Sequence, residues 1–107
     1  MRRGDVFWVN FEPALGGEIR KKRPAIIVSN DAANKAANRV QVVPLSSNVN
    51  KIGSWEARVM VGGRPHKAMA DQIRTISRER VLDKEGEVSG SDMAAVERAI
   101  RVQLALA

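Results

Sequence analysis

The chain has 107 residues, of which 44% are apolar and 28% charged, and this composition predicts one globular domain spanning residues 1–107. It contains no cysteine, which excludes a disulfide framework, a thiolate nucleophile and a cysteine-based metal site, and no stretch approaches the ~20 apolar residues of a membrane span. We therefore expect a cytoplasmic protein with no membrane partner. The net charge of +6 favours an anionic partner, with nucleic acid the leading candidate.

The first predicted strand covers residues 4–11. Its apolar side chains occupy both faces, with Val6 and Trp8 on one and Phe7, Val9 and Phe11 on the other. This pattern predicts a strand that is buried twice, once in the core and once against a helix or a second subunit. We expect Trp8 to belong to the core rather than to stack on a nucleic-acid base.

A mobile, cationic flap is expected at residues 12–22, because the pair Gly16-Gly17 permits positive φ. Four cations occur within the five residues 19–23, a density that can neutralise phosphates. A short core strand follows at residues 25–28. Because Pro24 forces an extended backbone on the residue before it, we expect Arg23 to project from the mouth of this strand.

The middle of the chain predicts further short strands joined by turns. Residues 29–39 form a turn with about one helical turn, and a second core strand at 40–45 runs into Ser46, Ser47 and Asn48. The remaining predicted elements are a loop at 48–54, a half-buried strand at 55–61, a tight turn at 62–65, a strand at 68–76, and a helical turn with a short strand at 77–88.

The C-terminus carries the clearest helix signal. Ser89 and Asp92 have the spacing of a capping box. An apolar stripe follows at helical spacing and serves the core or a dimer seam; its members are Met93, Val96, Ile100 and Leu104. Several short strands with one terminal helix predict a mostly β (α+β) fold, a small barrel.

The inventory of reactive side chains is small. His66 is the only histidine, which excludes a two-histidine ribonuclease mechanism within one chain, and its Gly/Pro/Arg-rich surroundings predict a surface turn. No metal-ligand spacing, phosphate-binding glycine loop or nucleophile elbow occurs. Cleavage of single-stranded RNA suits this inventory, because the substrate supplies its own nucleophile, the 2′-OH. The protein then has only to align the reacting groups and stabilise charge.

Three collinear blocks of sequence resemble the MazF/PemK (Kid) family of toxin endoribonucleases. The first is GDVFWVNFEP followed by GGE and KRPAIIVS (residues 4–29), the second is VVPLSS (residues 42–47), and the third is ADQIRTI (residues 70–76). The resemblance covers nearly the whole chain. It implies an SH3-like barrel, a homodimer, metal-independent cleavage of single-stranded mRNA at short motifs without a cofactor, and a cognate acidic antitoxin of the MazE type.

The resemblance also assigns roles to residues. Arg23 matches the family's catalytic arginine, Glu18 a carboxylate in the flap, and Ser46 a position where most members carry a catalytic threonine, so the hydroxyl is kept. Ser47 points to the opposite face of the strand. RNA contacts are expected from Gly17, Ile19, Arg20, Lys21, Lys22, Ser47, Asn48, Asp71 and Gln72.

Two departures from the family pattern concern the chemistry. Met69 replaces an arginine used by the Kid branch, and Lys22 stands where some members have histidine. Because arginine, with a pKa above ~12, is a poor proton donor, the expected role of Arg23 is stabilisation of the phosphorane charge. Glu18 would take the 2′-OH proton, and Ser46 would donate to a non-bridging oxygen.

Two other classes of function remain open at this point. The same barrel family includes a toxin that binds DNA gyrase and cuts no RNA, and a barrel that binds RNA without cleaving it would carry the same charge. The pair Arg23 and Ser46 beside a basic flap favours the nuclease, since a gyrase-binding protein has no need of it.

Overall fold

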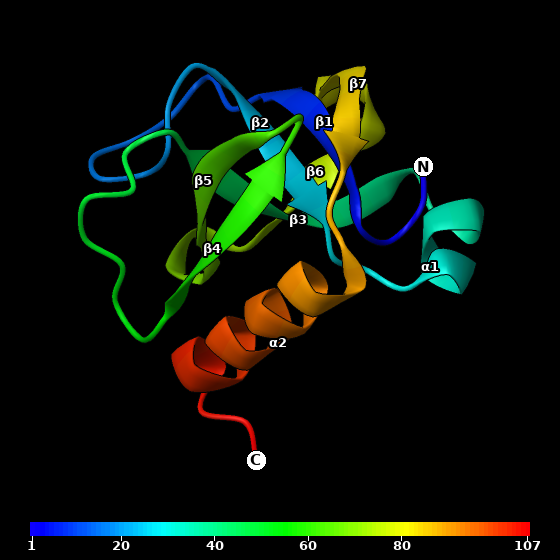
Figure 1. Ribbon diagram of the computed structural model, residues 1–107. Coiled ribbons are helices and arrows are strands. Elements are labelled where there is room, and N and C mark those ends of the chain that lie inside the picture. Colours follow the sequence, from blue (N-terminus) through cyan, green and yellow to red (C-terminus); the bar gives the residue numbers. More distant parts are fainter.

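The computed structural model describes residues 1–107 and contains seven strands, two α-helices and two 3₁₀ turns (Figure 1). The strands are β1 (Asp5–Asn10), β2 (Lys22–Ile27), β3 (Arg39–Ser46), β4 (Glu56–Val61), β5 (Arg64–Met69), β6 (Arg74–Ser77) and β7 (Val81–Glu87). The helical elements are α1 (Asp31–Ala36), η1 (Ala70–Gln72), η2 (Arg78–Arg80) and α2 (Gly90–Leu104). No helix is both long enough and apolar enough to cross a membrane.

All strand pairs are antiparallel, and the strands run in the order β4-β5-β3-β2-β1-β7 with β6 beside β3. β3 is the spine of the sheet: it pairs with β2 on one side, and with β6 and then β5 on the other. The sheet curls around its core, and α2 packs against β4 (Figure 1). The predicted class, mostly β with a C-terminal helix, is confirmed.

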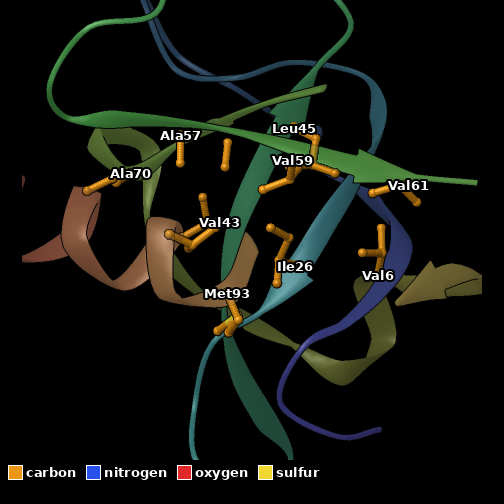
Figure 2. Packing of buried hydrophobic residues seen from close by; sticks show 12 residues of the cluster. Val6, Ile26, Val43, Leu45, Ala57, Val59, Val61, Ala70 and Met93 are labelled. Carbon is orange, nitrogen blue, oxygen red and sulfur yellow. The ribbon is translucent and has the colours of Figure 1, made fainter. Parts of the chain in front are cut away.

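Two apolar clusters fill the fold, and β1 contributes to both. Val6 belongs to the first cluster, where β2, β3, β4, β5, η1 and α2 supply the other side chains (Figure 2). Val9 and Phe11 belong to the second, with residues from β2, β3 and β6. The predicted burial of β1 on both faces is confirmed, but the chain itself covers the second face, without a helix or another subunit.

The segment after β4 differs from the prediction. Gly62 and Gly63 have φ values of +58° and +76°, which a two-residue hairpin turn requires, and Val61 pairs with Arg64 directly across it. β5 therefore begins at Arg64, where a turn was expected. The predicted strand at 68–76 is wrong, because it comprises the end of β5, η1 and most of β6.

Both helices begin at capped positions. The Asn30 side chain accepts a hydrogen bond from Ala33 N (2.9 Å) at α1, which forms the expected helical turn, six residues in length. Ser89 Oγ accepts from Asp92 N (3.1 Å), so the predicted cap of α2 is confirmed. The Asp92 carboxylate accepts from Met60 N (2.9 Å), and this contact ties the start of α2 to β4.

The buried face of α2 is shorter than the predicted stripe. Met93 and Val96 are buried, and Ala99 joins them in the first cluster. Ile100 packs against the edge of this cluster, whereas Leu104 remains 49% exposed. The last turn of the helix has passed beyond the sheet, so its apolar side chains lie on the surface.

Candidate active site

The cationic stretch enters the sheet earlier than the sequence indicated. β2 begins at Lys22, because Lys22 and Arg23 already pair with Asn10 and Val9 of β1. The backbone of Arg23 is thereby held within a strand. Its Nε donates to the carbonyl of Arg20 (3.0 Å), and the terminal Nη groups make no hydrogen bond. A guanidinium oriented in this way presents two donors for an oxyanion.

Arg23 lines a cavity of about 550 Å³ at the end of the first cluster, where Leu45 and Val61 belong to the core. The full lining consists of Trp8, Lys21, Lys22, Arg23, Pro24, Leu45, Ser47, Val61, Gly62, Arg64, His66 and Glu85. Four of these residues are permanent cations and one is a carboxylate. The cavity therefore attracts anions.

The two serines at the end of β3 occupy different surroundings. Ser47 lines the Arg23 cavity, whereas Ser46 does not, and the Ser46 Oγ accepts a hydrogen bond from Asn48 N (3.1 Å). The pairing of β2 with β3 ends at Ala25 and Pro44, and Ser46 itself pairs with Lys67 of β5. Arg23 thus shares a cavity with Ser47 and not with Ser46.

The flap has a fixed base. Phe11 N donates to Lys21 O (2.9 Å) where the loop opens. The Glu12 carboxylate accepts from the backbone N–H groups of Ala14 (3.1 Å) and Lys21 (2.9 Å). Arg80 adds hydrogen bonds to the carbonyls at the end of β1. The loop expected to be mobile is therefore tied down at its two ends.

Glu18 lies apart from the Arg23 cavity. It lines a second depression of about 320 Å³ together with Asp71, Gln72, Ile73 and Arg74. Its Oε1 accepts a hydrogen bond from Leu15 N (2.8 Å) within the flap. The structure thus places three of the predicted site residues, Glu18, Asp71 and Gln72, beside one another, and Arg23 with Lys21, Lys22 and Ser47 in the neighbouring cavity.

The lining of the Arg23 cavity includes polar and aromatic residues that were not predicted as site residues, among them Trp8, Arg64, His66 and Glu85. Trp8 is only half-buried and its indole N–H donates to Glu85, so the core position expected for it is wrong. His66 lies on β5 rather than in a turn, with Nδ1 3.1 Å from the carbonyl of Arg64. The pair Gly62-Gly63 could have indicated the position of His66. A glycine pair between two strand-like segments predicts a hairpin, and residue 66 then lies on its second strand.

Shifted pKa values occur outside both depressions. A hydrogen bond from the backbone N–H of Arg3 (2.7 Å) lowers the pKa of Asp31. Desolvation lowers the pKa of Lys84, but the charges of Asp5 and Glu87, each 3.4 Å from its Nζ, raise it overall. Neither group lines the Arg23 cavity.

Comparison with known proteins gives matches along nearly the whole chain. Residues 2–104 match the family described as PemK-like, MazF-like toxin of type II toxin–antitoxin system. Endoribonuclease MazF9 of Mycobacterium tuberculosis is 38% identical over 117 residues, which cover 99% of this chain and 98% of that relative. The crystal structure of MazF from Deinococcus radiodurans has a TM-score of 0.87 at 25% identity, covering 98% of this chain and 96% of that chain.

A second solved structure shares the fold. It is an endoribonuclease in complex with its cognate antitoxin from Mycobacterial species, with a TM-score of 0.84 at 24% identity. The superposition covers 100% of this chain and 97% of that chain. The two chains thus share the same overall fold.

Proposed function

The chain belongs to the PemK-like, MazF-like toxin family of type II toxin–antitoxin systems, and from this premise we propose that it is a cytoplasmic endoribonuclease that cleaves single-stranded mRNA at a short sequence motif. The observation that carries the proposal is Arg23, whose free Nη groups stand at a cavity lined by three further cations. The relatives named endoribonucleases support the same activity.

The proposed reaction is attack by the substrate's own 2′-OH on the adjacent phosphorus. The 2′-oxygen forms a bond to phosphorus, and the bond from phosphorus to the 5′-oxygen of the next nucleotide breaks. The products are a 2′,3′-cyclic phosphate and a 5′-OH end, and the departing oxygen takes a proton from solvent. Because the nucleophile belongs to the RNA, the step requires alignment and charge stabilisation and no cofactor or metal ion.

Each proposed catalytic residue has one task. Arg23 stabilises the negative charge that develops on the phosphorane oxygens, since its fork matches two oxygens at once. Ser46 donates a hydrogen bond to a non-bridging oxygen, and Glu18 accepts the 2′-OH proton. The RNA strand would extend from the Arg23 cavity toward the depression that holds Glu18, where Asp71 is available for a base edge.

Incubating the purified protein with naked single-stranded RNA in EDTA tests this proposal. Discrete fragments that form in EDTA support the nuclease. Binding without cutting would indicate an RNA-binding barrel, and neither binding nor cutting, together with inhibition of DNA supercoiling by gyrase, would indicate the gyrase-binding type. The same incubation with the Arg23→Ala variant identifies any contaminating ribonuclease, because a contaminant would cut equally in both samples.

The protein is further proposed to act as a homodimer. β1 gives no argument for a dimer, because apolar residues on both of its faces are buried within the chain. Apolar side chains are exposed elsewhere, among them Met60 (44%), Leu82 (42%) and Leu104 (49%). Burying such side chains between two copies removes apolar area from water. Light scattering at micromolar concentration should return about twice the chain mass of 11.7 kDa. A value near the chain mass itself would contradict the dimer.

An acidic antitoxin is the second proposed partner, because the positive charges of the flap and the Arg23 cavity attract a flexible anionic segment. Such a segment would fold across the flap and the Arg23 cavity and compete with RNA. Since charge steers the encounter, association should slow as salt rises, while apolar anchors hold the complex.

The charge of the flap provides the test of this partner. Lys21→Glu/Lys22→Glu should weaken inhibition by a peptide from the neighbouring small acidic gene product, and the peptide should block RNA binding to the unmodified protein. Lys35→Glu is a matched control, because Lys35 is exposed on α1 and lines neither depression near the flap. Inhibition that is unchanged by the double substitution and by high salt would place the partner elsewhere.

A further inference from the structure

The side-chain amide of Gln72 bridges two backbone groups of the flap. Its Oε1 accepts a hydrogen bond from Ile19 N (3.1 Å), and its Nε2 donates to Gly17 O (3.3 Å). The orientation of the amide follows from these partners, because an N–H must meet the oxygen and a carbonyl must meet the NH₂ group. The amide thus forms hydrogen bonds with the backbone of these two flap residues, as the backbone of a neighbouring strand would.

Gln72 is anchored independently of the flap. It ends η1, whose first residue, Ala70, is fully buried in the first cluster, and Ile73 N closes the turn on Ala70 O (3.2 Å). η1 also contacts α2, β3 and β4. The amide therefore connects the flap to the packed body of the protein.

The two hydrogen bonds of Gln72 reach the residues immediately before and after Glu18. Gly17 and Ile19 are its direct neighbours in the chain, while the hydrogen bonds of Glu18 itself, made by its N–H and its Oε1 with Leu15, stay within the flap. Within residues 17–19, the Gln72 amide makes the only hydrogen bonds to the body of the protein. The Ile19 side chain adds an apolar contact with the second cluster. The location of the Glu18 carboxylate relative to the body thus depends on Gln72.

We propose that Gln72 is a positioning residue, which fixes the flap backbone on both sides of Glu18 to the body of the protein. Each end of its amide already makes one hydrogen bond to flap backbone, so a base contact would have to use the remaining N–H and lone pair. The inference rests on the proposed endoribonuclease function, because it concerns how Glu18 is brought to the substrate.

The bridge itself is testable without RNA, by amide hydrogen exchange in Gln72→Ala and in the nearly isosteric Gln72→Glu. Gln72→Ala removes both hydrogen bonds, whereas Gln72→Glu keeps an acceptor for Ile19 N and loses only the donor to Gly17 O, so it should loosen only the Gly17 side of the bridge. The Ile19 amide should exchange roughly three- to tenfold faster in Gln72→Ala, the ratio expected for one lost hydrogen bond. Gln103→Glu, at an exposed position on α2, is the matched control and should leave flap exchange unchanged. Unchanged exchange at Ile19 in Gln72→Ala would overturn the proposal, whether or not the protein cuts RNA.

Kinetics and cut-site sequencing distinguish positioning from base reading. Positioning predicts that Gln72→Ala lowers kcat by a similar factor on every cleavable sequence, with the profile of cut sites preserved. Base reading alone predicts a changed profile, an effect that depends on one base and unchanged flap exchange, and that combination would overturn the proposal. If the unmodified protein cuts no RNA, the proposed function fails, while the exchange measurement still decides whether Gln72 holds the flap.

Discussion

Replacing Arg23 with alanine should lower the turnover of single-stranded RNA by about a hundredfold or more, as removal of one preorganised charge at a reacting centre typically does. The reason is geometric. The backbone of Arg23 is fixed by its pairing with Val9, its Nε is held by the Arg20 carbonyl, and its Nη groups are free at the cavity. No other side chain of the cavity is restrained in this way by both strand pairing and a hydrogen bond to the flap.

Two companion variants make the Arg23 result specific. Arg23→Lys keeps the charge but loses the bidentate fork, so it should recover only part of the lost rate. Arg39→Ala removes an exposed arginine from the opposite end of the same sheet, at the start of β3, and should leave turnover unchanged. Thermal unfolding should shift little in all three variants, because neither arginine belongs to an apolar cluster. Near-normal turnover in Arg23→Ala would remove the arginine from the mechanism.

Ser46→Ala should also lower turnover by about a hundredfold, because it removes the proposed hydrogen-bond donor to the phosphorane. Ser47→Ala is the informative partner experiment, since Ser47 and not Ser46 lines the Arg23 cavity. The account predicts a large loss of kcat in Ser46→Ala and a weaker effect, mainly on KM, in Ser47→Ala. The reverse order would move the catalytic hydroxyl to Ser47. Single-turnover kinetics on one short RNA separates the two results.

Ser46→Thr completes this series. It restores the hydroxyl together with the methyl group of the family's threonine, and should therefore retain near-normal turnover. The Ser46 Oγ accepts a hydrogen bond from Asn48 N, so loss of the hydroxyl also frees the start of the loop at 48–54. A Ser46→Thr variant as slow as Ser46→Ala would indicate that loop geometry, and not the hydroxyl, accounts for the loss.

The parts of the fold that follow from local pattern were predictable. The two-faced apolar pattern of β1 and the Ser89 cap of α2 are recognisable because residue spacing alone encodes them. The β5–η1–β6 region was not predictable in the same way. There, Ala70 is buried on a 3₁₀ turn between two short strands, and alternation cannot distinguish such a turn from a continuous strand.

The candidate site was predictable in its residues but not in its grouping. The sequence indicates Arg23, Glu18 and Gln72 as candidates, yet it carries no information on which cavity each one lines. Trp8 is the instructive error: its spacing with Val6 indicates a core residue, but it lies where the curled sheet opens and faces a cavity. Long-range partners such as Glu85 for Trp8 and Gln72 for Ile19 depend on the tertiary fold.

The central claim is that the RNA supplies the nucleophile and the protein stabilises the charge. The most direct test uses one short cleavable RNA and a matched strand in which a single 2′-OH, on the nucleotide immediately 5′ of the scissile phosphate, is replaced by hydrogen. The account predicts that both strands bind, that only the all-ribose strand is cut, and that its products carry a 2′,3′-cyclic phosphate and a 5′-OH. Cleavage of the deoxy-substituted strand at the same bond would contradict it.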